Sequence, residues 1–385
     1  MHLIGPDKLH GFERQLAVDL HADLVHPVYR WKDGIPEANE PWEGVTRTSS
    51  RVPKHGAHIA ASEGMENIAE TGAGTTPEIE ADDLAVDEAI KYLQQQSSVP
   101  KQKPFALCVG LIAPHFPFVV PEPFFSQYYP HYADLPNLPD NHLQQLPKAA
   151  QRLRQAFGFW GHTEDQIRRA RAAYYGLVSY ADNKLERLLN VLDETGLADN
   201  TIVIHTSDHG EMLGDHGLVQ KGCRFYEGLV RVPLIFSWPG KILRGVQRHA
   251  LVELLDLTAT LVELAGLEQP EYMQGRSLLP MLVDADEPDY HRESVRCEYF
   301  DALAPEFTGS SGTFATMYRN DRYKLSVYHG HGQGELYDLQ EDPWEHENLW
   351  DHPDHQDLRA QLVLASFDQH VLLTTDVGSA RIAPM

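Results

Sequence analysis

The sequence lacks long apolar runs, an excess of basic charge and a cysteine framework. No stretch reaches the roughly 18 apolar residues of a transmembrane helix, and the first eight residues have neither the basic nor the apolar part of a secretory signal. The 385 residues include 32 Lys and Arg against 56 Asp and Glu, a formal charge of −24. We therefore expect no membrane partner and no nucleic-acid partner. The unpaired cysteines favour a cytoplasmic location, and a periplasmic location is the alternative.

The three cysteines are Cys108, Cys223 and Cys297. They are odd in number and far apart, so they predict neither a disulfide framework nor a CxxC zinc site. Two features are well represented instead. Hydrophobic residues make up 42% of the chain, which is enough for a core. The 21 histidines are more than a protein of this length usually contains.

Apolar periodicity predicts alternating helices and strands. Amphipathic helices are expected over residues 82–96, from Thr163 to a stop at Gly196, over 256–265 with Asp256 as a candidate cap, and over 358–373. Thr163 and Gln166 have the spacing of a capping box. Strands are expected over residues 201–206 and 232–238 and, buried on both faces, over 105–113. This alternation predicts an α/β fold with a mostly parallel sheet flanked by helices.

The C-terminal part follows a different pattern. Short strands over residues 313–318, 323–328 and 335–338 predict a small antiparallel α+β subdomain, so we expect domains at 1–291 and 292–385. Near the other end, Pro27 to Thr76 has no persistent apolar period and is interpreted as a long loop region.

The segment from Thr201 to Gly240 carries the strongest functional pattern. The strand that ends at Thr206 is followed by Ser207, Asp208, His209 and Gly210, and ligands of open α/β sheets bind at the carboxyl ends of strands. The Asp208 carboxylate and the His209 ring could both reach one divalent ion, and glycine allows the backbone to turn. Lys221 lies in a glycine-rich loop, where it could serve as a point charge for an anion.

The whole segment resembles the sulfatase family of the alkaline-phosphatase superfamily. The residues that carry the resemblance are SDHGEMLGDHG at 207–217, Lys221, FYE at 225–227 and RVPLI at 231–235. YKL at 323–325, ELYDL at 335–339 and the stretch from Asp342 to Leu349 resemble the family's C-terminal subdomain. The first 13 residues are similar to the choline-sulfatase-like branch, so the resemblance covers nearly the whole chain.

The resemblance implies specific roles. Asp208 and His209 correspond to part of the metal site, which in sulfatases usually holds calcium; the softer His ligand also admits manganese. Lys221 corresponds to the lysine that binds sulfate near the leaving oxygen. His115 corresponds to the histidine that contacts the sulfate ester and protonates the leaving group. His2 corresponds to the histidine that orients the nucleophile.

The family's nucleophile motif is missing. In sulfatases a Cys or Ser in Cys/Ser-x-Pro-x-Arg is converted to formylglycine, whose hydrated form attacks sulfur. None of the cysteines lies in such a motif, and Ser237-Trp238-Pro239 fails because Lys241 stands where Arg is required. The first metal-binding carboxylates and the Lys expected before His2 are also absent. We therefore expect an N-terminally truncated sulfatase whose formylglycine lies outside this chain.

Three other interpretations stay open. The chain could belong to a phosphonate monoester hydrolase or phosphodiesterase of the same superfamily, which would use the same Asp, His and Lys. It could be a non-catalytic protein derived from a sulfatase. A zinc hydrolase that uses the two DHG motifs at 208–210 and 215–217 is disfavoured, because the seven-residue spacing of His209 and His216 matches no compact zinc motif.

The expected partner is a small sulfated molecule. The choline-sulfatase-like start is compatible with choline sulfate, and Tyr29, Trp31 and Trp42 could present aromatic faces to a quaternary ammonium or simply pack the loop. An aryl sulfate or a sulfated sugar is the alternative, and the chain could also form a homo-oligomer.

The missing motif yields a direct prediction. The 385-residue chain on its own should show no sulfatase turnover and should fold poorly, because strands without neighbours would expose unpaired edges. Assays of the purified chain with an aryl sulfate and added divalent metal test this. Metal-dependent hydrolysis above the uncatalysed rate would contradict it.

Overall fold

The computed structural model describes two compact units of the chain. The described residues are 12–14, 16–17, 29–32, 35–38, 68, 71–99, 103–147, 150–151, 154, 162–221, 224–300 and 314–374, with the backbone alone at 29–32, 35–38 and 373–374. The first unit comprises Met1–Asn137, Gln155–Ala198 and Gly217–Gln220, and the second comprises Leu138–Arg154, Asp199–His216 and Lys221–Met385. The predicted domain boundary at 291/292 stays a prediction.

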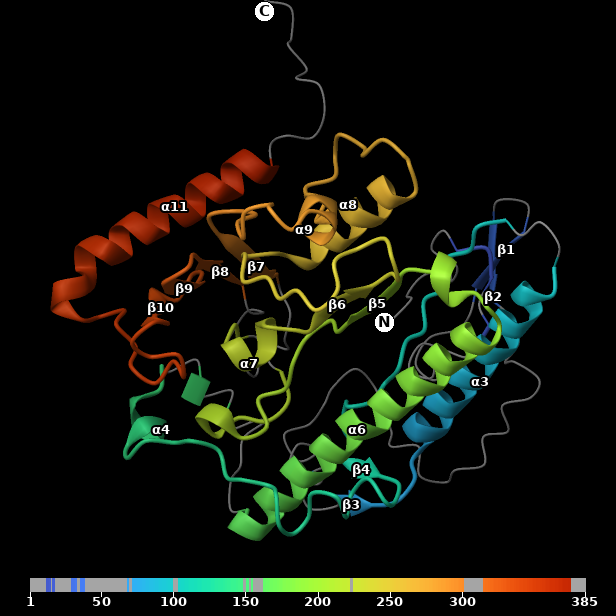
Figure 1. Ribbon diagram of the computed structural model, residues 1–385. Coiled ribbons are helices and arrows are strands. Elements are labelled where there is room, and N and C mark those ends of the chain that lie inside the picture. The colour runs from blue at the N-terminus through green and yellow to red at the C-terminus, as the bar shows by residue number, and fades with distance from the viewer. Residues whose placement is uncertain are drawn as a thin grey trace, which may run out of the picture. The chain divides into compact units, whose positions relative to one another are not determined.

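Two long helices form the main part of the first unit. Helices α3 (Pro77–Ser97) and α6 (Glu164–Glu194) lie side by side (Figure 1). Helix α3 begins five residues before the predicted start, because the Thr76 side chain accepts the Ile79 N–H and Pro77 occupies the first turn. The predicted capping box of Thr163 and Gln166 is present at the start of α6.

Short strands complete this unit. Strands β3 (Gly72–Ala73) and β4 (Val119–Val120) pair in parallel and contact α6. Strands β1 (Tyr29–Lys32) and β2 (Ile35–Ala38) form an antiparallel hairpin. The hairpin lies inside the stretch that was predicted as a loop region, so that prediction was wrong for these residues.

The strand predicted over residues 105–113 is not formed. The backbone there has no strand assignment, and alternate residues such as Ala106, Cys108 and Gly110 are exposed, so the segment is not buried on both faces. Its end is instead held by the buried carboxylate of Asp82, which accepts the N–H groups of Ile112 at 2.6 Å and Ala113 at 2.9 Å. The end of this apolar segment is therefore held by a side chain and not by pairing with a neighbouring strand.

The second unit contains the two strands predicted around the DHG motif. Strands β5 (Val203–Thr206) and β6 (Leu234–Ser237) are both present but pair antiparallel, with Thr206 opposite Leu234. In the described part of the connection between them lie the short helices η2 (Asp215–Gly217) and α7 (Glu227–Val230). The antiparallel register means that this pair does not follow the predicted parallel alternation.

Two further helices follow β6. Helix α8 (Leu254–Leu264) begins two residues before the predicted start, and Glu253 is its N-cap, with Asp256 at the third helical position of a capping box. Asp256 is therefore not the cap that the sequence suggested. Gly266 ends the helical stretch with φ of 70°. Helix α9 (Leu279–Val283) was not predicted.

A four-stranded antiparallel sheet forms the C-terminal part of the second unit. Its strands are β7 (Val295–Tyr299), β8 (Ala315–Arg319), β9 (Tyr323–Tyr328) and β10 (Gln333–Asp338), in the spatial order β10-β9-β8-β7. The three strands predicted in this region are confirmed, and β7 was missed. The α/β class with a C-terminal antiparallel part is therefore confirmed.

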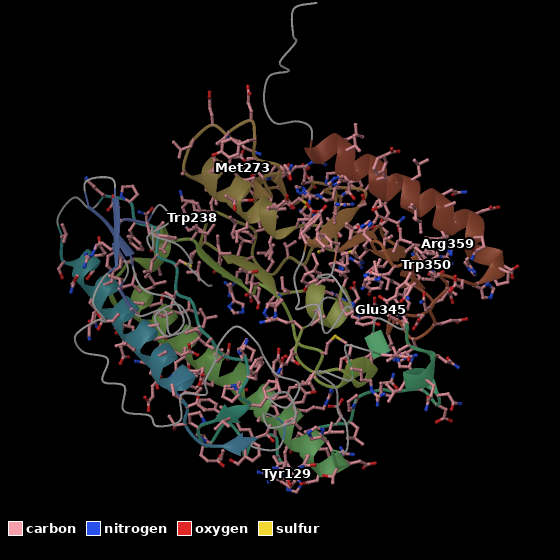
Figure 2. The ribbon with its side chains drawn as sticks, turned by 180° about the vertical axis from the view of Figure 1, so that it is seen from behind. Tyr129, Trp238, Met273, Glu345, Trp350 and Arg359 are labelled. Carbon is pink, nitrogen blue, oxygen red and sulfur yellow. The ribbon has the colours of Figure 1, made fainter. Side chains whose placement is uncertain are left out.

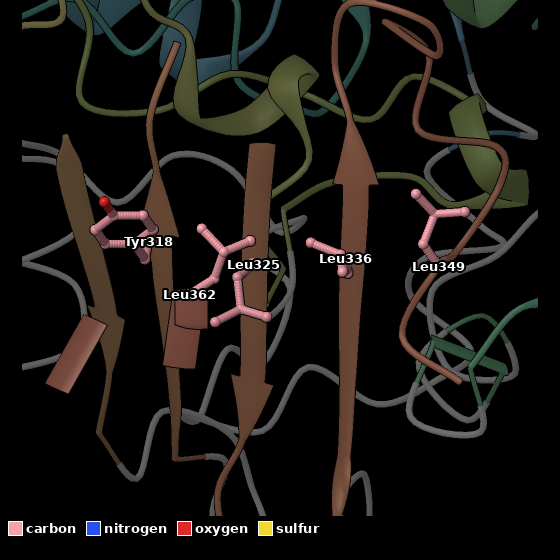
Figure 3. Close-up of a cluster of buried hydrophobic side chains, with 5 residues drawn as sticks. All are labelled: Tyr318, Leu325, Leu336, Leu349 and Leu362. Atoms are coloured by element: carbon pink, nitrogen blue, oxygen red, sulfur yellow. The ribbon is translucent and has the colours of Figure 1, made fainter. Parts of the chain in front are cut away.

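Helix α11 (Gln356–Thr374) packs on this sheet. Figure 3 shows the cluster of buried side chains that joins them, which consists of Tyr318, Leu325, Leu336, Leu349 and Leu362. Near the start of α11, the Arg359 guanidinium lies 4.8 Å from the centre of the Trp350 ring, and both residues are labelled in Figure 2. Among the described helices, none combines the length and the apolar character that crossing a membrane requires.

The contact between α11 and the sheet allows a matched test. Leu362 is 6% exposed in the core cluster, whereas Leu364 on the same helix is 60% exposed. Leu362→Ala should lower the free energy of unfolding by about 2–4 kcal/mol. Leu364→Ala should change it by less than about 0.5 kcal/mol. Urea unfolding followed by circular dichroism measures both, and equal effects would show that the helix does not pack as described.

Candidate active site

Asp208 and His209 lie directly after β5, as the sequence predicted. The Asp208 side chain is 78% exposed, and one of its oxygens lies 3.9 Å from Nε2 of His209. Its other oxygen accepts the backbone N–H of His209 at 3.0 Å. Burial of the surroundings favours the protonated acid, but the His209 ring and the N–H groups of Asp208 and His209 hold the pKa of Asp208 below its usual value. Asp208 is therefore an accessible carboxylate anion.

The two nitrogens of the His209 ring have different partners. Nδ1 lies 2.7 Å from the Gly210 carbonyl oxygen, so it carries the ring proton in the neutral form. This leaves a lone pair on Nε2, which lies 3.0 Å from Nζ of Lys221. The second unit thus brings together three of the residues that the sequence singled out: Asp208, His209 and Lys221.

Lys221 is a partly desolvated cation beside this pair. Burial lowers the pKa of Lys221, whereas the carboxylates of Asp208 and Glu211 favour its charged form. A desolvated ammonium group attracts an anion more strongly than one in free solvent. The position therefore suits a side chain that binds a negatively charged group.

Gly210 allows the turn to approach helix α7 closely. A Cβ atom at this position would lie 1.9 Å from the carbonyl oxygen of Gly228, a distance that no real side chain tolerates. The Gly210 N–H donates to the Leu229 carbonyl at 2.8 Å, and the Glu211 N–H donates to the Gly228 carbonyl at 3.2 Å. The candidate ligands are thus fixed to α7 by backbone contacts.

A buried polar network holds α7 in turn, and sequence reasoning missed it. Lys324, 1% exposed on β9, forms ion pairs with Glu227 at the start of α7 and with Glu345. Glu345 also accepts the backbone N–H of Glu227 at 2.6 Å. The sequence feature that could have indicated this network is Lys324, a charged residue between Tyr323 and Leu325 in a strand with an apolar pattern, because a buried lysine is almost always paired.

The second DHG motif has a different environment. His216 is 3% exposed, stacks on the Tyr226 ring with 3.9 Å between centroids, and lies with Nδ1 2.9 Å from Nε2 of His142. Burial, together with His142 and His346, lowers the pKa of His216 to about 3, so the ring is neutral. His216 lies in a buried packing position, in keeping with the structural role that the sequence favoured over zinc.

The other predicted site residues belong to the first unit or lie outside the described residues. His115 lies in the first unit, where Nδ1 is 2.7 Å from the Phe116 carbonyl oxygen and the ring packs on that of Phe116. His2 and Trp42 lie outside the described residues, and Tyr29 and Trp31 are described by backbone alone.

The chemistry of Asp208 and His209 fits part of a metal site. A carboxylate oxygen and an unprotonated ring nitrogen, 3.9 Å apart, are suitable ligands for one divalent ion, although Nε2 of His209 lies 3.0 Å from Nζ of Lys221 here. The pair is not a complete site, since calcium takes about six to eight oxygen ligands. Within residues that the structure describes, no group of three or more His, Cys, Asp or Glu side chains is arranged to hold a metal ion.

Comparisons with known proteins identify the family of this chain. The sulfatase family profile matches residues 40–267, and the profile of the C-terminal region of N-sulphoglucosamine sulphohydrolase matches residues 214–369. The first match covers more than half of the chain. The chain belongs to the sulfatase family.

Individual relatives are longer than this chain. A choline-sulfatase of Rhizobium meliloti (strain 1021) is 30% identical over 92% of this chain and 64% of its own length. An arylsulfatase of Clostridium perfringens is 28% identical over 69% of this chain and 52% of its own length. The structure of a phosphonate monoester hydrolase from Silicibacter pomeroyi matches with a TM-score of 0.65 and 26% identity, over 77% of this chain and 60% of that one. The chain thus spans about half to two thirds of the length of these relatives.

The contact between Gly210 and α7 predicts a sensitive position. Gly210→Ala should displace the turn or α7 and lower the free energy of unfolding by roughly 2 kcal/mol or more. Gly110→Ala is the control, because a Cβ atom there would meet nothing within 4 Å. Denaturant unfolding measures both variants, and a Gly210→Ala protein as stable as the control would refute the close approach.

Proposed function

We propose that this chain forms part of a sulfuric ester hydrolase that cleaves a sulfate monoester. The observation that carries the proposal is the arrangement of Asp208, His209 and Lys221 at the end of β5, with the ammonium nitrogen 3.0 Å from the ring nitrogen. An anionic ester would be held there by a lysine and by a metal-binding pair. Membership of the sulfatase family supports this assignment.

Each site residue has a proposed role. Asp208 and His209 bind a divalent ion, with calcium as the first choice and manganese as the second; the ion would supply positive charge against the sulfate. Lys221 binds a sulfate oxygen and stabilises charge on the leaving oxygen. His115 contacts the ester and protonates the leaving group, and His2 orients the nucleophile. The nucleophile is a formylglycine outside this chain.

The proposed substrate is a small sulfated molecule. Choline sulfate is supported by the similarity to the Rhizobium meliloti choline-sulfatase, and an aryl sulfate by the similarity to the Clostridium perfringens arylsulfatase. Phosphonate monoester hydrolysis is the second candidate, because the Silicibacter pomeroyi structure matches this chain well and a monoanionic phosphorus ester presents the same charge as a sulfate ester.

The test uses an enzyme that joins this chain to a segment supplying the nucleophile. Asp208→Asn and Lys221→Met should each lower kcat/KM for a sulfate monoester by roughly 100-fold, as expected when a group that stabilises developing charge is lost. Lys241→Met is the control, because Lys241 lies in an exposed turn after β6, and it should leave kcat/KM unchanged.

Parallel assays decide between the candidate reactions. Higher kcat/KM for the sulfate monoester than for a phosphonate monoester supports the proposal, and the reverse order assigns the second candidate. An enzyme that hydrolyses neither, although it is folded and carries the nucleophile, would favour a non-catalytic role.

A further inference from the structure

The turn that carries Asp208 and His209 is held by residues more than a hundred positions further along the chain. Its backbone is fixed to α7 by the bonds from Gly210 to Leu229 and from Glu211 to Gly228. The first residue of α7, Glu227, is fixed by Glu345, which accepts its N–H at 2.6 Å. Backbone and buried side-chain contacts thus connect Glu345 to the turn without a break.

Glu345 occupies an unusual position for a carboxylate. Its side chain is 3% exposed, and its backbone adopts φ of 60°, in the left-handed region that glutamate rarely enters. Local strain of this kind persists only where surrounding contacts impose it. The contacts at Glu345 include the N–H that it donates to the Asp342 carbonyl at 3.1 Å, the Glu227 N–H that its carboxylate accepts, and its ion pair with Lys324.

The charges around Glu345 come from several elements. Lys324 on β9 pairs with both Glu345 and Glu227, and Arg319 on β8 lies 3.6 Å from the Glu227 carboxylate. Tyr337 on β10 and His216 also lie within the electrostatic reach of this network. Glu345 is therefore one of two carboxylates that share a buried lysine.

We propose that Glu345 is a positioning residue, which holds α7 and thereby the Asp208–Gly210 turn. The consequence for metal and substrate binding rests on the function proposed for Asp208 and His209. The contacts that fix α7 to Glu345 do not depend on that proposed function.

The direction of the pH effect follows from burial. Burial raises the pKa of Glu345 to about 7, although Lys324 and the Glu227 N–H work against this shift. A carboxyl group whose pKa is higher in the closed state than in an open, solvated state favours closure at low pH. The stability that this carboxyl group contributes to the closed state is fully present below its ordinary pKa of 4.5. It is lost as the pH rises to about 7.

Hydrogen exchange of the Gly210 and Glu211 amides measures the hold directly. In the enzyme that joins the unaltered chain to the segment supplying the nucleophile, the protection factors of these amides, corrected for intrinsic exchange, should fall roughly 10- to 100-fold between pH 4.5 and pH 7.5. Mass spectrometry of the peptide that contains both residues provides the readout, and a peptide from α8, in the same unit, reports whether that unit is folded.

Three variants separate positioning from a general effect on stability. Glu345→Gln keeps an acceptor for the Glu227 N–H without a titrating charge, so protection should become flat over this pH range. Glu345→Ala removes the acceptor and should lower protection at every pH. Glu347→Gln makes the same chemical change at an exposed residue and should behave like the unaltered chain.

Two results would overturn the proposal. One is unchanged protection of both amides in Glu345→Ala. The other is the same pH dependence in Glu345→Gln as in the unaltered chain, a comparison that still decides the matter if Glu345→Ala does not fold. Because the readout is amide protection, a failed sulfatase assay leaves this result standing, and failure here leaves the sulfatase assignment untouched.

Discussion

The close approach of Gly210 to helix α7 is the constraint on which the candidate site depends. With only a hydrogen atom as side chain, residue 210 lets its backbone and that of Glu211 bond to the carbonyls of Leu229 and Gly228. Any larger residue would separate the turn from the helix. The strand before the turn and the helix behind it therefore fix the backbone that carries Asp208 and His209.

The chemistry of the site follows from this fixed backbone. The Gly210 carbonyl sets the tautomer of His209, which leaves the Nε2 lone pair toward Lys221. An exposed carboxylate, a ring nitrogen with a lone pair and a desolvated ammonium group then lie together at the end of one strand. This combination suits a divalent ion and an anionic ester, and it agrees with membership of the sulfatase family.

Local signals in the sequence predicted much of this arrangement. The capping box at Thr163, the strand that delivers Asp208 and the three C-terminal strands each follow from patterns within a few residues. What could not be predicted depends on long-range contacts. The segment over 105–113 has a strand-like apolar run, but its backbone is held by the Asp82 carboxylate. Similarly, Glu345 reaches Glu227 through tertiary packing that no short motif encodes.

The central claim is that Asp208 and His209 bind one divalent ion, and selective line broadening by manganese tests it most directly. Substoichiometric Mn²⁺ added to the chain should broaden the NMR signals of the His209 ring and the Gly210 amide before those of His205, an exposed histidine on the same strand. Asp208→Asn should abolish this selectivity. Equal broadening of the His209 and His205 rings, or broadening that persists unchanged in Asp208→Asn, would contradict the account.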